Sequence, residues 1–190
     1  MADRISHNAD AVVTGAGSGL GRAFALELAQ RGGRVVCSDI NRKAAQATAT
    51  AIVEAGGQAI AVACDVAKLE QVEALSAKAG DWFGNAPSLV INNAGVGLGG
   101  KRVEDISMAD WQWIMGINLW GVIHGCHVFV PQLRAAGRGG VLNVASAASF
   151  GAAPMMGAYN ATKSAVVSIS ETLHAELAGS GVRVAVLCPT

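Results

Sequence analysis

The sequence predicts a single α/β domain built on a doubly wound parallel sheet. Short apolar runs recur along the chain and alternate with longer segments of helical periodicity. The expected strands are Ala11–Thr14, Arg34–Ser38, Ala59–Cys64, Leu89–Asn92, Val141–Ala145 and Val182–Cys188. Because these strands are almost continuously apolar, we expect parallel pairing, right-handed crossovers and helices on both faces of the sheet.

The composition fits one compact domain over residues 1–190. The chain is 52% hydrophobic and only 15% charged, which suits a large buried core. No stretch has the composition of a linker, a repeat or a low-complexity tail. The glycine-rich segment Val96–Lys101 is interpreted as a mobile loop.

The charge balance and the cysteines limit the partners and the location that we expect. Basic and acidic residues both number 14, so no net field favours a nucleic acid or an anionic membrane surface. The polar start MADRISHNAD and the short, interrupted apolar stretch INLWGVIHGCHVFV predict no membrane span. Four scattered cysteines without a CxxC pair indicate buried thiols in a reducing, cytoplasmic setting: Cys37, Cys64, Cys126 and Cys188.

The first expected strand runs into the glycine-rich stretch TGAGSGLG. Gly15, Gly19 and Gly21 stand where the chain must turn, let a ligand approach the backbone and pack a helix against the sheet. A helix that begins near Leu20 directs its free N–H groups and positive dipole end towards a pyrophosphate. The stretch therefore predicts a dinucleotide site, with a plain tight turn as the alternative.

The second expected strand ends in an acid that favours NAD over NADP. Asp39 follows Gly21 by 18 residues, which is the place where an acid accepts hydrogen bonds from the adenosine ribose hydroxyls. Its charge repels a 2′-phosphate, and neither Ser18 nor Ile40 supplies a compensating positive charge. The alternative role for Asp39 is the N-cap of a helix that begins near Arg42.

A second group of polar residues lies in the other half of the chain. Tyr159, the only tyrosine, shares a helix face with Lys163, and Ser146 precedes it by 13 residues at the end of a strand. A free phenol, with a pKa near 10, is a poor base at neutral pH, but an ammonium one turn away favours the phenolate. We expect Tyr159 to act as the general base or acid and Ser146 to hydrogen-bond the substrate oxygen. The alternative is an amphipathic helix with a partly buried tyrosine and a solvated lysine.

These motifs together resemble the short-chain dehydrogenase/reductase family. The matching elements are TGxxxGxG at Thr14–Gly21, NNAG at Asn92–Gly95, Asn118 in a long helix, and Ser146 with YxxxK. The resemblance implies a three-layer Rossmann fold with strand order 3-2-1-4-5-6 and an NAD(P)-dependent exchange of hydride between an alcohol and a carbonyl compound. A protein that keeps the fold and binds or senses the dinucleotide without turnover is the alternative function.

The resemblance also implies roles for further residues. Asn118 would connect Lys163 to a water chain, and Asp65 and Val66 would contact the adenine, a strand-end turn being the alternative for them. Asn92 and the backbone of Ala94 and Gly95 would line the cleft, whereas sheet stabilisation is an equal alternative for Asn93. The expected catalytic set is Asn118, Ser146, Tyr159 and Lys163, of which Ser146 and Tyr159 contact substrate. The expected cofactor set is Gly15, Ser18, Gly19, Leu20, Asp39, Ile40, Asp65, Val66, Asn92, Ala94, Gly95, Tyr159, Lys163 and Pro189.

The family pattern usually continues beyond this chain. A glycine is expected after the position of Pro189, followed by a substrate-covering segment and a last strand, but Thr190 stands there instead. We therefore expect residues 1–190 to be part of a longer protein and to leave the substrate unspecified. Two long apolar helices, around Trp111–Leu133 and Ala158–Leu177, predict a homodimer or homotetramer.

Two other patterns favour structural roles over chemistry. HGCH at His124–His127 has too few ligands for zinc and no second cluster, so helix packing or a subunit contact is expected and no metal site is predicted. The tryptophan-rich stretch Trp111–Trp120 is interpreted as a core or subunit-facing helix surface. The chain has no GxSxG elbow, so Ser146 is not expected to be a hydrolase nucleophile.

Overall fold

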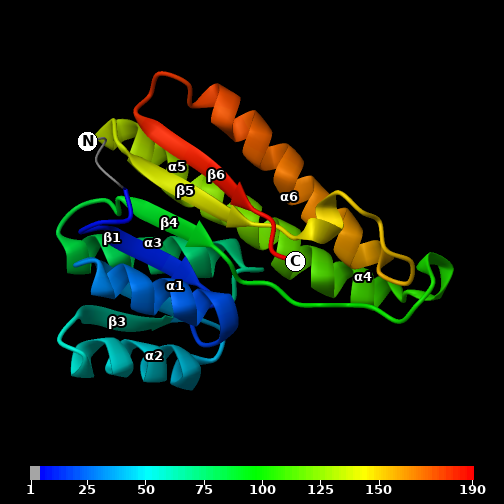
Figure 1. Ribbon diagram of the computed structural model, residues 1–190, viewed down its shortest axis with the longest axis horizontal. Coiled ribbons are helices and arrows are strands. Elements are labelled where there is room, and N and C mark those ends of the chain that lie inside the picture. The colour runs from blue at the N-terminus through cyan, green and yellow to red at the C-terminus, as the bar shows by residue number, and fades with distance from the viewer. Residues whose placement is uncertain (1–4) are drawn as a thin grey trace.

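The computed structural model describes residues 5–190, so the first part of the polar N-terminal stretch, residues 1–4, lies outside it. Strands and helices alternate along this part of the chain (Figure 1). The strands are β1 (Asp10–Thr14), β2 (Arg34–Asp39), β3 (Gln58–Ala63), β4 (Leu89–Asn92), β5 (Gly139–Val144) and β6 (Val182–Leu187). The α-helices are α1 (Gly19–Gln30), α2 (Arg42–Glu54), α3 (Leu69–Phe83), α4 (Met108–Met115), α5 (Gly121–Ala136) and α6 (Gly157–Glu176). Short 3₁₀ turns occupy Val103–Asp105 and Ala147–Ser149.

The six strands form one parallel sheet in the order β3-β2-β1-β4-β5-β6, which confirms the predicted fold class. The strand order reverses between β1 and β4, where Val12 lies opposite Val90. All carboxyl ends therefore meet at one edge of the sheet, on the side towards which α4 extends in Figure 1.

Alternate residues of the strands supply two separate cores. Val12 and Val36 point to the face covered by α3, α5 and α6, whereas Val13 and Val35 point to the face covered by α1 and α2. All four side chains are fully buried, and each such valine stabilises the fold by about 1.5–3 kcal/mol relative to an exposed one. This alternation fixes the register of the strands, because a slip by one residue exchanges the two faces.

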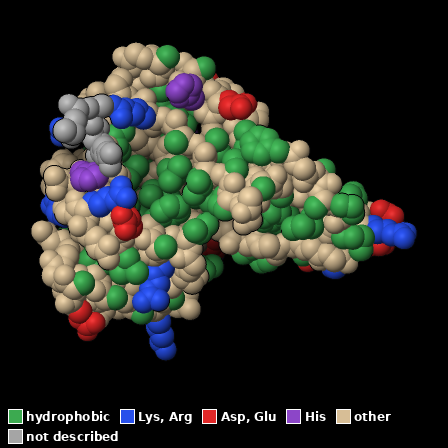
Figure 2. Space-filling model, in the orientation of Figure 1, with side chains coloured by type: hydrophobic (Ala, Val, Ile, Leu, Met, Phe, Trp, Pro, Cys, Tyr) green, Lys and Arg blue, Asp and Glu red, His purple; other side chains and the backbone are tan. Residues whose placement is uncertain are grey.

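Helices cover both faces of the sheet over β1–β3, as expected, whereas within residues 5–190 one face is partly open over β4–β6. The helices that pack on β5 and β6, α5 and α6, share one core cluster with them and so lie on one face. On the other face, a hollow of about 500 Å³ lies between α1 and strands β4–β6. Its apolar lining includes Phe24, Leu28, Ile91, Leu142 and Ala185, and Figure 2 shows hydrophobic side chains gathered on this face.

The stretch from α4 to α5 forms one long helix, Met108–Ala136, with a π-helical turn at Gly116–Trp120. Its 29 residues and its mean hydropathy of 1.3 over an 18-residue window reach the length and hydropathy of a membrane-crossing helix, two criteria that the core helix of a folded domain also meets. In this fold the helix is a core element, because Phe129 and Leu133 are fully buried against the sheet.

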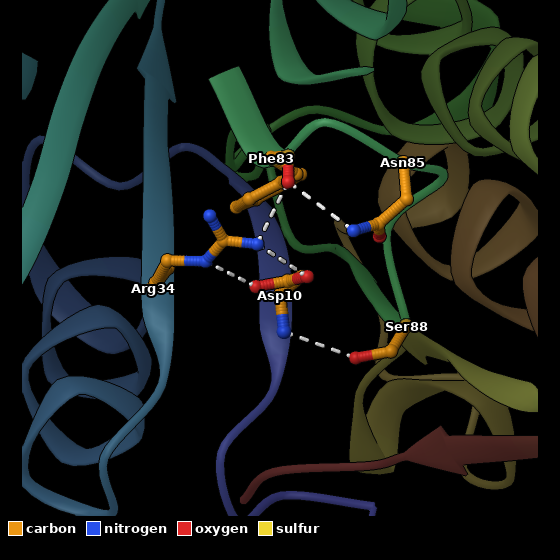
Figure 3. Close-up of polar contacts among 5 residues, drawn as sticks. All are labelled: Asp10, Arg34, Phe83, Asn85 and Ser88. Atoms are coloured by element: carbon orange, nitrogen blue, oxygen red, sulfur yellow. Dashed lines mark hydrogen bonds and ion pairs between the residues drawn. The ribbon is translucent and has the colours of Figure 1, made fainter. Parts of the chain in front are cut away.

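A charged cluster closes the end of the sheet opposite to the carboxyl edge (Figure 3). The Arg34 guanidinium donates from Nε to Asp10 Oδ1 at 2.7 Å, and from Nη2 to Asp10 Oδ2 at 2.8 Å and to the Phe83 carbonyl at 2.9 Å. It also lies 5.8 Å and 5.2 Å from the ring centroids of Trp82 and Phe83. The hydrogen bond to Asp10 raises the pKa of Arg34, and the cluster joins β1 and β2 to the end of α3.

We expect Arg34→Met to lower the free energy of unfolding by about 1–3 kcal/mol, because it leaves the half-buried Asp10 carboxylate without its partner. Arg31→Met is the matched control, since Arg31 pairs with Glu27 in an exposed i,i+4 ion pair and should cost less than about 0.5 kcal/mol. Urea denaturation measures both variants. Equal losses in the two would show that the cluster adds nothing to the sheet.

Candidate active site

A cleft of about 990 Å³ opens at the carboxyl edge of the sheet. One side is formed by the turn after β1 and by the ends of β2 and β3, and the other by the segments after β4 and β5 and by the start of α6. Of the predicted site residues, the cleft is lined by Gly15, Ser18, Gly19, Leu20, Asp39, Ile40, Asp65, Val66, Ala94, Gly95, Ser146, Tyr159, Lys163 and Pro189. The fold thus brings most of the predicted site residues, from two distant regions of the sequence, to one cavity.

In the turn after β1, glycine is required at different positions for different steric reasons. Gly15 and Gly19 have φ values of +66° and +52°, which side chains rarely adopt. A Cβ on Gly21 would overlap the Gly15 carbonyl oxygen. Helix α1 begins at Gly19, its N-cap Ser18 makes no side-chain cap bond, and its first turn carries no acid. The positive end of α1 thus faces the cleft with free N–H groups, which suits an anion.

Asp39 holds the glycine turn from the neighbouring strand. Its Oδ2 accepts a hydrogen bond from the Gly17 N–H and its Oδ1 accepts one from the Asn41 N–H, both at 2.9 Å. The alternative that Asp39 caps α2 is wrong, because Asn41 is the N-cap and accepts from the Ala44 N–H at 3.2 Å. Gly17 is a site residue that the sequence reasoning missed: a Cβ there would lie 2.8 Å from Asp39 Oδ2.

The residues after β3 are fixed by short hydrogen bonds. Asp65 Oδ1 accepts from the Ala67 N–H at 3.1 Å, and the Asp65 N–H donates to the side chain of Gln71 at 2.8 Å. The Val66 carbonyl lies 2.8 Å from Nδ1 of His124 on α5. His124, from the HGCH stretch, therefore packs its helix against the floor of the cleft.

The two asparagines of the NNAG stretch differ from their predicted roles. Asn92, expected to line the cleft, is buried inside the sheet, where it donates to Asn143 Oδ1 at 2.8 Å. Asn93 lines the cleft instead and donates from Nδ2 to the Thr14 carbonyl at 2.9 Å. The reason is position: Asn92 is the last residue of β4 and pairs with Asn143 in the sheet, whereas Asn93 is the first residue beyond it.

Asn118 is fully buried in the π-helical turn between α4 and α5. Its Oδ1 accepts from the Val96 N–H at 2.8 Å, and its Nδ2 donates to the Val96 carbonyl at 2.9 Å and to Thr162 Oγ1 at 3.3 Å. The Thr162 hydroxyl in turn donates to the Tyr159 carbonyl at 2.8 Å. Asn118 therefore connects the segment after β4 to α6, and π-helical turns of this kind are frequent at functional sites.

Tyr159, Lys163 and Ser146 all line the cleft. Lys163 Nζ lies 5.8 Å from the ring centroid of Tyr159 and donates to the Val144 carbonyl at 2.9 Å. Ser146 follows β5, and its Oγ accepts from the Ala148 N–H at 3.2 Å. The first turns of α6 thus place a phenol and an amine in the cleft that the hydroxyl after β5 also lines.

Lys163 is only 4% exposed, so the alternative of a solvated lysine is wrong. Burial lowers its pKa to about 8, because an ammonium loses solvation when it is taken out of water. Gly95 leaves room for it: a Cβ at Gly95 would lie 3.4 Å from Lys163 Nζ and 3.3 Å from Asn118 Oδ1. A buried amine that shares a cleft with a phenol is an arrangement typical of acid–base sites.

Comparisons with known proteins show the family of the chain. A family model described as short chain dehydrogenase matches residues 9–190. The cyclohexanol dehydrogenase of an Acinetobacter species is 38% identical over 178 residues, which cover 94% of this chain and 70% of the relative. The chain belongs to the short-chain dehydrogenase family.

Two further relatives show how much of a related protein this chain covers. The oxidoreductase EphD of Mycobacterium tuberculosis is 38% identical over 93% of this chain, but the chain spans only 30% of its length. A short-chain dehydrogenase/reductase from Burkholderia phymatum, solved in complex with NAD, is 43% identical with a TM-score of 0.91 and covers 94% of this chain. The chain spans 64% of that structure.

The buried amine makes stability depend on pH in a defined direction. The folded protein holds the Lys163 proton less tightly than the unfolded chain, so the unfolded chain binds more protons between pH 8 and 10.5 and stability rises with pH in this window. The measured quantity is the free energy of unfolding of the cofactor-free parent minus that of Lys163→Met. This difference should rise by up to about 3 kcal/mol from pH 7 to pH 10.5. Urea denaturation at several pH values measures it.

Lys43→Met serves as the control, because Lys43 is exposed on α2 and the substitution removes an amine that is not buried. A constant difference between the parent and Lys163→Met across this pH range would contradict the burial of a titrating ammonium.

Proposed function

We propose that the protein is an NAD-dependent oxidoreductase that interconverts a secondary alcohol and a ketone. The observation that carries the proposal is the shared cleft: Tyr159, buried Lys163 and Ser146 form one part of it, and the N-terminus of α1 with Asp39 forms another. The Burkholderia relative solved with NAD and the relative named cyclohexanol dehydrogenase support this assignment. A relative named D-threitol dehydrogenase, from Mycolicibacterium smegmatis, is 37% identical over 95% of the chain.

The residues present fit a nicotinamide dinucleotide. The uncapped α1 N-terminus and the open space at Gly19 suit the pyrophosphate, and the acid at the end of β2 suits the adenosine ribose. Asp65, Val66 and Pro189 would border the cofactor, as would Ala94 and Gly95. When bound, the nicotinamide ring would accept or donate the hydride.

Side chains of this chain would transfer the proton to and from the substrate oxygen. In oxidation the Tyr159 phenolate takes the proton of the substrate hydroxyl, and in reduction the phenol returns a proton to the carbonyl oxygen. The Ser146 hydroxyl donates a hydrogen bond to the same oxygen and stabilises its developing charge. The Lys163 ammonium, held near the ring of Tyr159, favours the phenolate. A water chain beyond Lys163 would carry the proton onwards past Asn118.

We also propose a homodimer or homotetramer in a reducing, cytoplasmic setting. The exposed Trp113 and Trp120 on the long helix leave apolar surface that a second copy would cover. The four cysteines are all free, with Cys37 and Cys64 buried, and burial raises the pKa of the Cys37 thiol to about 12. Inert buried thiols are compatible with such a setting.

We expect Tyr159→Phe to lower turnover of a secondary alcohol at least about 100-fold in the full-length protein, because the variant lacks the group that exchanges the substrate proton. The dissociation constant for NAD should change less than about twofold, since the phenol acts on the substrate and not on the adenosine half. Steady-state kinetics and a fluorescence titration measure the two effects. Turnover within about tenfold of the parent would refute the acid–base role and favour a protein that binds the dinucleotide without catalysis.

We expect the protein to bind NAD at least about tenfold more tightly than NADP, because the Asp39 carboxylate repels a 2′-phosphate. Asp39→Ala should narrow this ratio. Asp65→Asn is the matched control: it removes one negative charge from the same cleft but should leave the ratio unchanged. Calorimetric titration with each cofactor decides it, and tighter binding of NADP by the parent would overturn the assignment.

A further inference from the structure

The catalytic stretch YNATKS carries a second pair of polar side chains beside the first. Each residue that follows a member of the Tyr159–Lys163 pair bonds to the segment between β5 and α6. Asn160 Nδ2 donates to the Ala153 carbonyl at 2.8 Å, and Ser164 Oγ donates to the Ser149 carbonyl at 3.0 Å. Because these two residues are four apart on α6, they share one helix face.

The segment that they hold, residues 147–156, is part of the cleft wall. It begins directly after Ser146 and ends at the residue before α6, and its lining residues are Ala147, Ala148, Gly151, Ala153 and Met156. The alanine and methionine side chains give this wall an apolar surface. The position of the segment therefore decides what space lies in front of the Ser146 and Tyr159 hydroxyls.

The end of this segment is held in a strained conformation. Met155 has a φ of +64°, which a residue with a side chain rarely adopts. Its carbonyl accepts from the Gly100 N–H at 2.8 Å, and Lys101 forms an isolated parallel bridge with Met156. Such a backbone persists only when several contacts fix it. The contacts from α6 and from the segment after β4 serve that purpose.

Asn160 is suited to be the main contact from α6. The residue is 8% exposed, and within residues 5–190 its Oδ1 has no hydrogen-bond partner. The bond to Ala153 is thus the only side-chain hydrogen bond by which this amide acts on its surroundings in the described chain. A buried amide whose only hydrogen bond in the described chain is a donation to a loop carbonyl positions that loop.

We propose that Asn160 is a positioning residue that holds segment 147–156 as the substrate-side wall, with Ser164 as a second attachment. By fixing that wall it keeps the Ser146 hydroxyl and the Tyr159 phenol directed at one substrate oxygen. The role rests on the proposed alcohol and ketone chemistry. It concerns the substrate side of the cleft, so cofactor binding does not depend on it.

Hydrogen exchange tests the placement without any need for turnover. In Asn160→Ala, the backbone amides of 148–156 should exchange at least about tenfold faster than in the parent. The amides of the glycine turn, residues 14–21, should exchange at the parent rate. Thr172→Ala is the matched control, since it removes an exposed hydroxyl on the same helix that bonds only to the Ser168 carbonyl within the described chain. Unchanged exchange in 148–156, or an equal increase throughout the protein, would overturn the proposal.

Kinetics on the full-length protein test the consequence. Asn160→Ala should raise KM for the alcohol about fivefold or more, with a smaller change in kcat and an NAD dissociation constant within about twofold of the parent. A purely structural role would lower the melting temperature and leave KM unchanged, and that result would contradict the positioning role. If the parent oxidises no secondary alcohol, the proposed function fails, while the exchange data still decide whether Asn160 holds the wall.

Should Asn160→Ala fail to fold, Ser164→Ala takes its place, because the Ser164 side chain is exposed and its loss leaves no cavity in the core. Faster exchange confined to residues 147–151 in that variant would support the attachment of the segment to α6. Parent-like exchange there would refute it.

Discussion

The point on which the site depends is the contact between Thr14 and the Asn93–Ala94 backbone, where the strand order reverses. The Thr14 hydroxyl accepts from the N–H groups of Asn93 at 3.0 Å and Ala94 at 3.1 Å and donates to the Ile91 carbonyl at 3.3 Å. Asn93 returns a bond to the Thr14 carbonyl. These bonds join the glycine turn after β1 to the segment after β4. Without them, the two sides of the cleft would have no fixed spacing at the switch point of the sheet.

A second set of buried bonds fixes the catalytic half relative to this point. Asn92 on β4 bonds to Asn143 on β5, whose Nδ2 donates to Ser170 Oγ on α6 at 3.0 Å. Gly125 lets α5 approach closely, since a Cβ there would overlap the Asn92 side chain. Hydrogen bonds buried this deeply specify one arrangement, because a shift that breaks them costs the desolvation of a donor and an acceptor with nothing in return. The helix that carries Tyr159 and Lys163 is thereby fixed on the sheet.

Helix α6 contributes to the site through two of its faces. One face presents Lys163 to a buried position where desolvation weakens its hold on a proton, and the adjacent face bonds to the wall of the cleft through Asn160 and Ser164. The amine is tolerated there because it donates to the Val144 carbonyl. A single helix thus couples the electrostatics of the proposed acid–base pair to the shape of the space in front of it.

The sequence by itself determined the fold class, the strand order expected from the resemblance, and most of the residues that meet in the cleft. Periodicity and glycine spacing are local properties of the chain, so they are readable before folding. Only the tertiary structure decided between Asn92 and Asn93 as the residue that lines the cleft, whether Asp39 caps α2, and whether Lys163 is solvated or buried. It also showed that one face of β4–β6 carries an open hollow. These outcomes depend on strand register and on contacts between distant segments, which a linear pattern does not encode.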